Sequence, residues 1–331
     1  MKNYTINIWI GTNTKEAIMD KYKNVLVLGG TGFVGKNLQD IEPEWDYIGT
    51  CGGKIDYRVY DHVHALIEHY EPDAIVNLAA TVGGIKFNDE NKISQYEDNI
   101  LINTNILMAA RGLNVPRVLS ALSTCVFPNA MESCYPLDEF DLFYVQNDFH
   151  KELVFTEPFE GHKGYAWSKR MLQIHTELCR QLGYNYSTFC PSNIYGVYDK
   201  IGEDSHFVSA LINKVDNAKD GDTLKFWGTG LEKRQQLYVR DLAEMIPTLL
   251  EKHDSDRPVI IAPNENLTIS EMVGIMVEIS GKNLTVEFTG QRAGQVRKDC
   301  VNRGGAFQDL FGDYQYTSFR DGLKETYEWF V

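Results

Sequence analysis

A tyrosine and a lysine stand four residues apart in the run Tyr165-Ala-Trp-Ser-Lys169. Four residues are about one turn of an α-helix, so on a helix the two side chains share one face. An ammonium group there stabilises tyrosinate and lowers a phenol pKa that is ordinarily about 10. The pair can then serve as acid and base for a carbonyl being reduced, and the lysine can also hold a ribose. Because exposed structural pairs share this spacing, the prediction needs support from elsewhere in the chain.

Support comes from Ser123, in the run Ser123-Thr-Cys-Val-Phe-Pro128. This run follows residues 117–121, whose apolar character predicts a buried strand. Ligands bind at the carboxyl ends of strands in open α/β sheets. Ser123 is therefore placed to donate a hydrogen bond to the carbonyl that Tyr165 serves.

A glycine-rich run, Gly29-Gly-Thr-Gly-Phe-Val-Gly35, directly follows the apolar residues 24–28 and opens a predicted helix. Its spacing is GxxGxxG. The first glycine permits a tight turn, the second admits a pyrophosphate, and the third lets helix and strand pack closely. The helix N-terminus adds N–H donors and a partial positive charge. We therefore predict a dinucleotide site made by Gly29, Thr31, Gly32, Phe33, Val34 and Gly35.

The ribose-selecting position follows the second predicted strand, near residues 50–54, where no acidic residue occurs. Lys54 is placed to meet a 2′-phosphate, which favours NADPH over NADH, although a surface lysine would look the same. Asp56 is a candidate acceptor for the adenine amino group. The catalytic and glycine-rich motifs together predict a nicotinamide-dependent oxidoreductase or epimerase.

These motifs lie on predicted strands and helices that alternate with the spacing of βαβ units. This alternation predicts an α/β fold, a doubly wound parallel sheet of the Rossmann type. We expect strands at 24–28, 46–49, 74–78, 117–121 and 186–190, and helices at 35–40, 63–70, 99–111 and 165–182. The expected division is an N-terminal extension at 1–23, a dinucleotide-binding domain at 24–193 to which 236–263 returns, and a smaller substrate lobe from 194–235 and 264–331. Residues 127–164 show no clear period and predict a surface excursion. In the lobe, Ser270 is the expected N-cap of a helix to Ser280, and a strand is expected at 284–288.

Composition excludes several other classes. The 331 residues carry a formal net charge of −14, from 32 basic and 46 acidic side chains. Phosphate backbones require basic patches, so no nucleic-acid partner is expected, whereas a small anionic ligand needs only a local cluster of donors. The six cysteines form no CxxC pair and fit no zinc spacing, which predicts reduced thiols, a cytoplasmic protein and no metal. No apolar run approaches the roughly 18 residues of a membrane span.

Through these motifs, the chain resembles the extended short-chain dehydrogenases/reductases, and within them the GDP-L-fucose synthase family. The resemblance runs from about residue 24 to the C-terminus. It rests on the motifs above, on Asn77-Leu-Ala-Ala-Thr-Val-Gly-Gly84, Pro191-Ser-Asn-Ile-Tyr-Gly196 and Ser205-His206, and on Phe226-Trp-Gly-Thr-Gly230 and Arg234-Gln-Gln-Leu-Tyr-Val-Arg-Asp241. The cysteine of Ser-Thr-Cys and the later histidine discriminate this family from relatives such as sugar 4,6-dehydratases, which have Asp-Glu in that place.

The resemblance implies a 3,5-epimerisation and 4-reduction of a GDP-4-keto-6-deoxyhexose. Cys125 would be the base and His206 the acid at C3 and C5, and Ser123, Tyr165 and Lys169 would support reduction at C4. Taken alone, Cys125 has the character of a buried small apolar residue and His206 that of a surface histidine. Further dinucleotide contacts are implied for Leu78, Ala79, Ala80, Pro191, Asn193 and Ile194. Substrate contacts are implied for Val82, Gly83, Asn193, His206, Phe207, Leu211, Lys214, Trp227, Arg234 and Lys298.

One segment departs from the family, which usually has Gly-Pro-x-Asp-Asn where this chain has Gly196-Val-Tyr-Asp-Lys200. The alternatives are therefore the same or a reductase-only reaction on a related GDP-4-keto-deoxy sugar, of the colitose or deoxyheptose type, and a non-catalytic nucleotide-binding protein. The resemblance also implies a homodimer through helices 99–111 and 165–182. The apolar residues Ile102, Ile106, Met171 and Ile174 are its expected contacts.

Overall fold

The computed structural model describes residues 21–50, 54–128, 137–138, 141–142, 144–146, 153–155, 157–158, 162–202, 205–290 and 305–331. Most of the expected N-terminal extension and most of the excursion at 127–164 lie outside these residues, as does Lys298. Within the excursion, two short strands, β5 (Tyr144–Gln146) and β6 (Leu153–Phe155), pair antiparallel.

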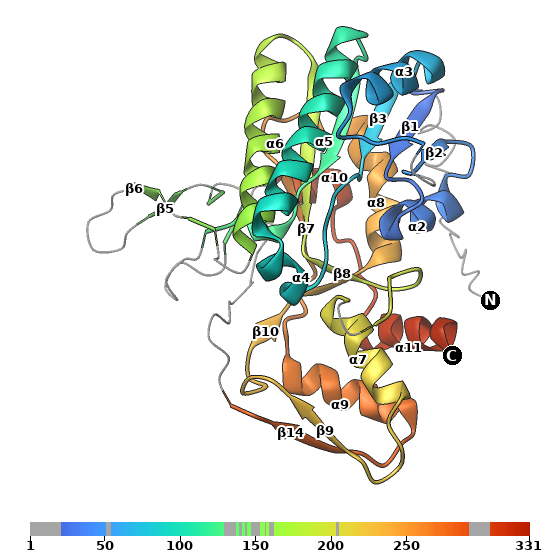
Figure 1. The fold of residues 1–331 in the computed structure, drawn as a ribbon, viewed down its shortest axis with the longest axis vertical. Helices are drawn as coiled ribbons and strands as arrows, with labels where there is room; N and C mark the ends of the chain where they lie inside the picture. Colours follow the sequence, from blue (N-terminus) through green and yellow to red (C-terminus); the bar gives the residue numbers. More distant parts are fainter. Residues whose placement is uncertain are drawn as a thin grey trace, which may run out of the picture.

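A six-stranded parallel sheet forms the centre of the molecule, in the order β12-β7-β4-β3-β1-β2 (Figure 1). Its strands are β1 (Val25–Leu28), β2 (Asp46–Ile48), β3 (Ala74–Asn77), β4 (Arg117–Ala121), β7 (Asn185–Pro191) and β12 (Val259–Ile261). The chain leaves β1 towards β2 and then returns to place β3 on the other side of β1. The carboxyl ends of β1 and β3 therefore flank a topological switch point, where such sheets bind ligands. This is the predicted doubly wound fold.

Helices cover both faces of the sheet. One layer packs α3 against α5 and α5 against α6, and the opposite layer packs α2 and α10 against α8. These helices are α2 (Phe33–Ile41), α3 (Tyr60–Tyr70), α5 (Lys92–Gly112), α6 (Lys163–Gln181), α8 (Val239–Lys252) and α10 (Ala306–Phe311), with the short α4 (Ile85–Glu90) before α5. Helix α5 begins seven residues before the predicted start at residue 99, because polar residues of its first two turns hid the helical period.

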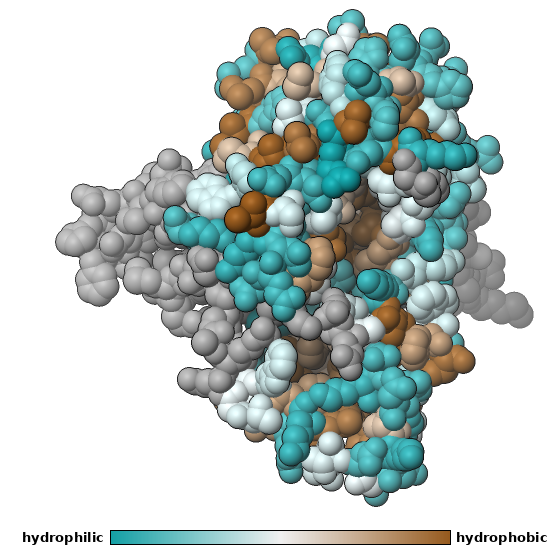
Figure 2. Space-filling view, viewed as in Figure 1, coloured by the Kyte–Doolittle hydropathy of each residue, from teal (hydrophilic) through white to brown (hydrophobic). Residues whose placement is uncertain are grey.

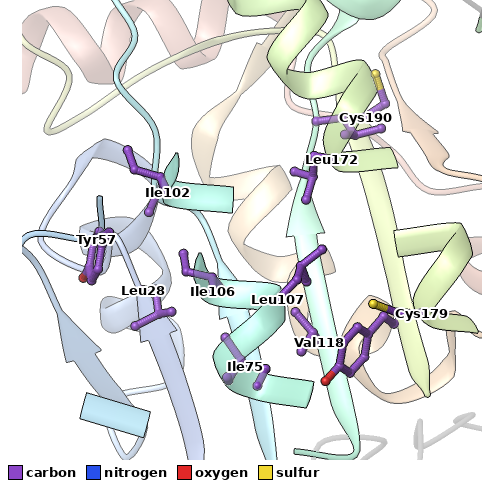
Figure 3. Packing of buried hydrophobic residues seen from close by; sticks show 14 of the residues in the cluster. Leu28, Tyr57, Ile75, Ile102, Ile106, Leu107, Val118, Leu172, Cys179 and Cys190 are labelled. Atoms are coloured by element: carbon purple, nitrogen blue, oxygen red, sulfur yellow. The ribbon is translucent and has the colours of Figure 1, made fainter. Parts of the chain in front are cut away.

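Alternation along the strands divides the apolar residues between two cores. In β1, Leu26 and Leu28 join the core under α3, α5 and α6, whereas Val25 and Val27 join the core under α8. Figure 3 shows the first of these cores, with strand residues facing Ile106 and Leu107 of α5. Both faces of the strands are buried, as expected for a parallel sheet between two helical layers.

A smaller lobe, drawn below the sheet in Figure 1, has its own apolar core. It contains α7 (Phe207–Asp216), α9 (Ile269–Ser280), α11 (Phe319–Phe330) and the parallel pair β9 (Thr223–Phe226) and β14 (Thr285–Phe288). The pairs β8 (Asn193–Tyr195) with β11 (Gln236–Tyr238) and β10 (Lys233–Arg234) with β13 (Leu267–Thr268) connect it to the rest of the chain.

The N-cap predicted for α9 was wrong. Thr268, not Ser270, caps this helix: its hydroxyl accepts from the Glu271 N–H, and the Glu271 carboxylate accepts from the Thr268 N–H. This reciprocal capping box satisfies two backbone donors at once, which the serine two residues later could not do.

Among the described residues, no helix is long and apolar enough to cross a membrane.

Candidate active site

A cavity of about 1660 Å³ opens where the sheet meets the lobe. Figure 2 shows this face hollowed between the two parts, with apolar atoms in the depth of the hollow. Pockets for one small ligand span roughly 300–1,000 Å³. The cavity therefore has room for two ligands side by side, such as a dinucleotide and a second nucleotide.

The glycine loop forms the sheet side of the cavity, and its backbone explains why glycine stands there. Gly29 has φ +81°, and a Cβ on it would lie 2.8 Å from the Ala79 nitrogen. A Cβ on Gly35 would collide with the Gly30 carbonyl. Gly32 is the exposed N-cap of α2 and lines the cavity. The tight turn, the helix packing and the open helix N-terminus together fit a pyrophosphate.

The other predicted dinucleotide residues have two different placements. The strand-end residues all line the cavity, and they are Leu78, Ala79, Ala80, Pro191, Asn193 and Ile194. Lys54 is exposed, and neither it nor Asp56 is among the described residues that line the cavity.

Arg58 holds the carboxylate of Asp56 through Nε and Nη2, at 2.9 and 2.7 Å. These hydrogen bonds lower the pKa of Asp56 to about 2. Nearby in the chain, Gly49, Thr50 and Tyr57 do line the cavity. The hydroxyl of Tyr57 accepts from the Gly29 N–H at 3.3 Å, a contact with the phosphate loop that the sequence analysis missed.

Ser123 and Cys125 lie at the carboxyl end of β4, on the cavity wall. Ser123 caps a single turn of 3₁₀ helix, Thr124–Val126, and its hydroxyl accepts from the Cys125 N–H at 3.3 Å. This turn places both residues on the cavity wall, and Cys125 is partly exposed. The residues predicted to act as base and as carbonyl-binding hydroxyl thus lie in one short segment.

Tyr165 and Lys169 lie on one face of α6, as their spacing predicted, and both are buried. The Lys169 ammonium donates to the Ala121 carbonyl at 2.8 Å. Burial lowers the pKa of Lys169 to about 8. The expectation that the lysine lowers the pKa of Tyr165 was wrong, because burial, followed by the neighbouring Cys125 and Cys190, raises it. The phenol therefore keeps its proton at neutral pH, the form that can protonate a carbonyl oxygen.

His206 approaches the cavity from the lobe, as the N-cap of α7. The imidazole is 42% exposed and its Nδ1 lies 3.4 Å from the carboxylate of Asp199. Cys125 and His206 thus come from opposite parts of the molecule to line one cavity. An acid and a base on two sides of a bound ring can exchange protons with both of its faces.

The lobe supplies the remaining predicted substrate residues, and those lining the cavity are Phe207, Leu211, Lys214, Trp227 and Arg234. The Lys214 ammonium donates to the Lys225 carbonyl and lies 4.6 Å from the centre of the Phe226 ring. Lys214, Lys225 and Arg234 line the lobe side of the cavity together with the acidic Asp222 and Glu232, and these three cations are the groups there that can neutralise a diphosphate. Val82 also lines the cavity, whereas Gly83 packs behind it, where a Cβ would meet the Phe87 ring.

A buried polar pair that includes the N-cap of α6 was not predicted. His162 is the N-cap of α6, and its Nδ1 lies 2.9 Å from the amide nitrogen of Asn88. Gln95 in turn donates to the Asn88 oxygen at 2.7 Å. Both His162 and Asn88 line the cavity. No sequence signal marked them, because the two residues are far apart in the chain and neither belongs to a recognised motif.

Comparison with known proteins agrees with this geometry. The sequence profile of the NAD dependent epimerase/dehydratase family matches residues 25–262. The chain belongs to this family. Among its relatives, it is 29% identical over 320 residues to GDP-L-fucose synthase of Dictyostelium discoideum, covering 93% of this chain and 95% of that protein. It is 24% identical over 319 residues to GDP-L-colitose synthase of Yersinia pseudotuberculosis, covering 93% and 97%.

A solved structure has the same architecture. The GDP-L-fucose synthetase of Naegleria fowleri, bound to NADP, superposes with a TM-score of 0.79 at 28% identity, over 93% of each chain. The family match and this superposition confirm the predicted fold class.

Proposed function

We propose that the chain is an NADPH-dependent 3,5-epimerase and 4-reductase that converts GDP-4-keto-6-deoxy-D-mannose to GDP-L-fucose. The observation that carries the proposal is the meeting of Cys125 and His206 with Ser123, Tyr165 and Lys169 around one cavity. A plain reductase needs only the last three residues. The relatives named as GDP-L-fucose synthases, and the NADP in the Naegleria structure, support the choice of substrate and cofactor.

Epimerisation uses the ketone at C4, which makes the protons at C3 and C5 removable. Cys125 takes a proton from the carbon, and His206 returns one on the opposite face of the ring. Ser123 and the protonated Tyr165 hold the C4 oxygen and stabilise the enolate that forms between the two transfers. NADPH, when bound, supplies the hydride to C4. Tyr165 then protonates the C4 oxygen, and the Lys169 ammonium beside it stabilises the resulting tyrosinate.

The two parts of the molecule divide the binding between them in this proposal. The glycine loop and strand ends of the sheet, in residues 24–193 and 236–263, hold NADPH, although Lys54 and Asp56 stay candidates only at its adenine end. The lobe, in residues 194–235 and 264–331, holds the GDP moiety. Lys214 and Arg234 face the diphosphate there, with Lys298 as a further candidate, and Trp227, Phe207 and Leu211 surround the nucleoside.

A second candidate substrate is the keto precursor of GDP-colitose, which the Yersinia relative favours. This sugar lacks the C3 hydroxyl. The His162–Asn88 pair is a polar lining that a hydroxylated ring would use better, since a site built to bind a hydroxyl discriminates against its absence.

We also propose a homodimer through α5 and α6, with corrected contacts. Ile102 and Ile106 are buried in the chain's own core and are not available to a partner. The exposed apolar residues of these helices are Ile93, Leu101 and Met108 on α5 and Ile174 and Leu178 on α6. Figure 2 shows apolar atoms at the surface over both helices. Exposed apolar residues gathered on two neighbouring helices are typical of an interface between subunits.

A cytoplasmic location belongs to the same proposal. Cys125, Cys179 and Cys190 are thiols rather than disulfides, as expected in a reducing compartment.

The experiment is an assay of NADPH oxidation with purified GDP-4-keto-6-deoxymannose and, separately, with the keto precursor of GDP-colitose. We expect turnover with both and a higher kcat/KM with the first. Tyr165→Phe is the control, because it removes the acid and keeps the packing. Higher kcat/KM for the colitose precursor would favour the second candidate, and NADPH binding with no oxidation of either sugar would contradict an enzymatic function.

A further inference from the structure

A buried carboxylate lies behind the imidazole of His206. Asp199 has a side chain only 4% exposed, and both of its oxygens lie 3.4 Å from Nδ1 of His206. Asp199 is not among the described residues that line the cavity, whereas His206 is. The carboxylate therefore approaches the ring from the protein interior and leaves the other side of the ring towards the ligand.

Asp199 is itself held by two further hydrogen bonds. The Lys200 N–H donates to one carboxylate oxygen at 2.8 Å, and the Ser209 hydroxyl donates to the other. Ser209 lies three residues after His206 on α7, so both side chains meet Asp199 from the same side of the helix. An ionised carboxylate accepts at about four positions, and three donors fix its orientation.

The loop that carries Asp199 is also anchored to the cofactor side. The amide of Asn37, on α2, donates to the Val197 carbonyl at 2.9 Å. Tyr198 has φ +69°, a left-handed conformation that a bulky residue adopts only when its surroundings hold it there. These contacts place the carboxylate accurately with respect to α2 as well as to α7.

We propose that Asp199 is a positioning residue that sets the orientation and tautomer of His206. An ionised carboxylate only accepts hydrogen bonds, so Nδ1 carries the proton in this contact and Nε2 is directed at the cavity. Nε2 is then the atom that exchanges protons with the carbons flanking the ketone. This inference rests on the proposed role of His206 in epimerisation. It also gives a function to the aspartate of the Gly196–Lys200 segment. This segment differs from the family pattern at other positions but keeps the aspartate.

The test compares Asp199→Asn with Asp216→Asn in the full-length enzyme. The first substitution keeps the size of the side chain and its contact with the Lys200 N–H but removes the carboxylate. Asp216 is at the other end of α7, and among the described hydrogen bonds its carboxylate contacts only the Tyr327 hydroxyl, at 3.4 Å. Two rates are measured for each variant with saturating NADPH: deuterium incorporation from heavy water at C3 and C5, and NADPH oxidation. The ratio of epimerised to unepimerised reduced product is also measured.

We expect Asp199→Asn to slow deuterium incorporation about 100-fold, a share of the roughly 10²–10⁴-fold that a positioned acid contributes. The KM should stay within about twofold, and the product should shift towards unepimerised sugar. A disturbance of the fold alone would lower exchange and reduction together. Asp216→Asn should leave both rates and the product ratio unchanged.

Ser209→Ala is a second variant in case Asp199→Asn does not fold. It loosens Asp199 and should move the same product ratio, by a smaller amount. Unchanged exchange in both variants, or an equal loss of exchange and reduction, overturns the positioning role. Absence of deuterium incorporation in the unmodified enzyme would instead overturn the proposed epimerase function, so the two failures are distinguishable.

Discussion

The Lys169 ammonium lies 5.7 Å from the centre of the Tyr165 ring and is held there by its hydrogen bond to the Ala121 carbonyl. The position of Lys169 beside Tyr165 is therefore set by β4 as well as by the helix that carries both residues. Because both side chains are buried, their protonation states follow from desolvation more than from each other. This has a direct consequence for pH dependence.

We predict that NADPH oxidation declines as pH rises through about 8. Burial lowers the pKa of Lys169 to about 8, so the ammonium form is complete below that pH and is lost above it. Burial raises the pKa of Tyr165, so the phenol keeps its proton over the same range. A pH profile of kcat measures this. In Lys169→Arg the guanidinium stays charged, so the residual kcat of this variant should not decline above pH 8. A flat kcat profile across pH 8 in the unmodified enzyme would disprove that titration of Lys169 controls the reaction.

A second prediction concerns the glycine loop. Gly29→Ala should destabilise the fold by about 1–2 kcal/mol, because the residue has φ +81° and its Cβ would meet the Ala79 backbone at 2.8–2.9 Å. It should also weaken NADPH binding by at least about tenfold through distortion of the turn. Thermal unfolding and fluorescence titration with NADPH measure the two effects.

Gly274→Ala is the matched control for this change. Gly274 is exposed inside α9, and a Cβ there would meet nothing within 4 Å. The substitution should stabilise the protein by roughly 0.5–1 kcal/mol and leave NADPH affinity unchanged. Equal effects from the two substitutions would mean that the geometry of Gly29 does not matter.

The third prediction separates the roles of the cysteines. Cys125→Ser should reduce epimerisation about 100-fold or more, because a hydroxyl is a far weaker base than a thiolate, and should spare NADPH affinity. Cys179→Ala should change stability by about 1 kcal/mol without changing the product, since Cys179 is buried in the core. Exchange of protons in heavy water measures epimerisation, and titration with NADPH measures cofactor affinity. A loss of NADPH affinity in the Cys125 variant would argue against the role of Cys125 as the base.

The fourth prediction concerns assembly. Leu178→Glu should convert a dimer to a monomer, because it places a charge within the apolar surface of α5 and α6. Val331→Glu, at an exposed residue outside that surface, should leave the assembly unchanged. Light scattering coupled to gel filtration gives the masses, and a monomeric unmodified protein would remove the basis of the proposal.

Much of the fold and the motif residues of the candidate site were predictable because their signals are contiguous in sequence. The glycine loop and the Tyr165–Lys169 pair each lie within a few residues, so spacing alone placed them on the correct elements. Buried strands such as β3 were visible as unbroken apolar runs. Residues that long-range contacts bring to the cavity or its neighbourhood gave no such signal, and Asp199, Tyr57 and Asn88 are examples.

The proposed dimer contacts show a second limit. Helix α5 is apolar on several sides, and the sequence does not tell which side faces its own sheet. Ile102 and Ile106 pack inwards, whereas Leu101 and Met108 point outwards. Only the packing of α5 against α3 and α6 fixes the rotation of the helix about its axis.

We propose that two proton exchanges and one reduction take place in one cavity. The measurement that tests it most directly is turnover of GDP-4-keto-6-deoxymannose with NADPH in heavy water, followed by NMR of the product. The account predicts GDP-L-fucose that carries solvent deuterium at both C3 and C5. A reduced sugar without deuterium at either carbon would contradict it, because Cys125 and His206 would then have no part in the reaction.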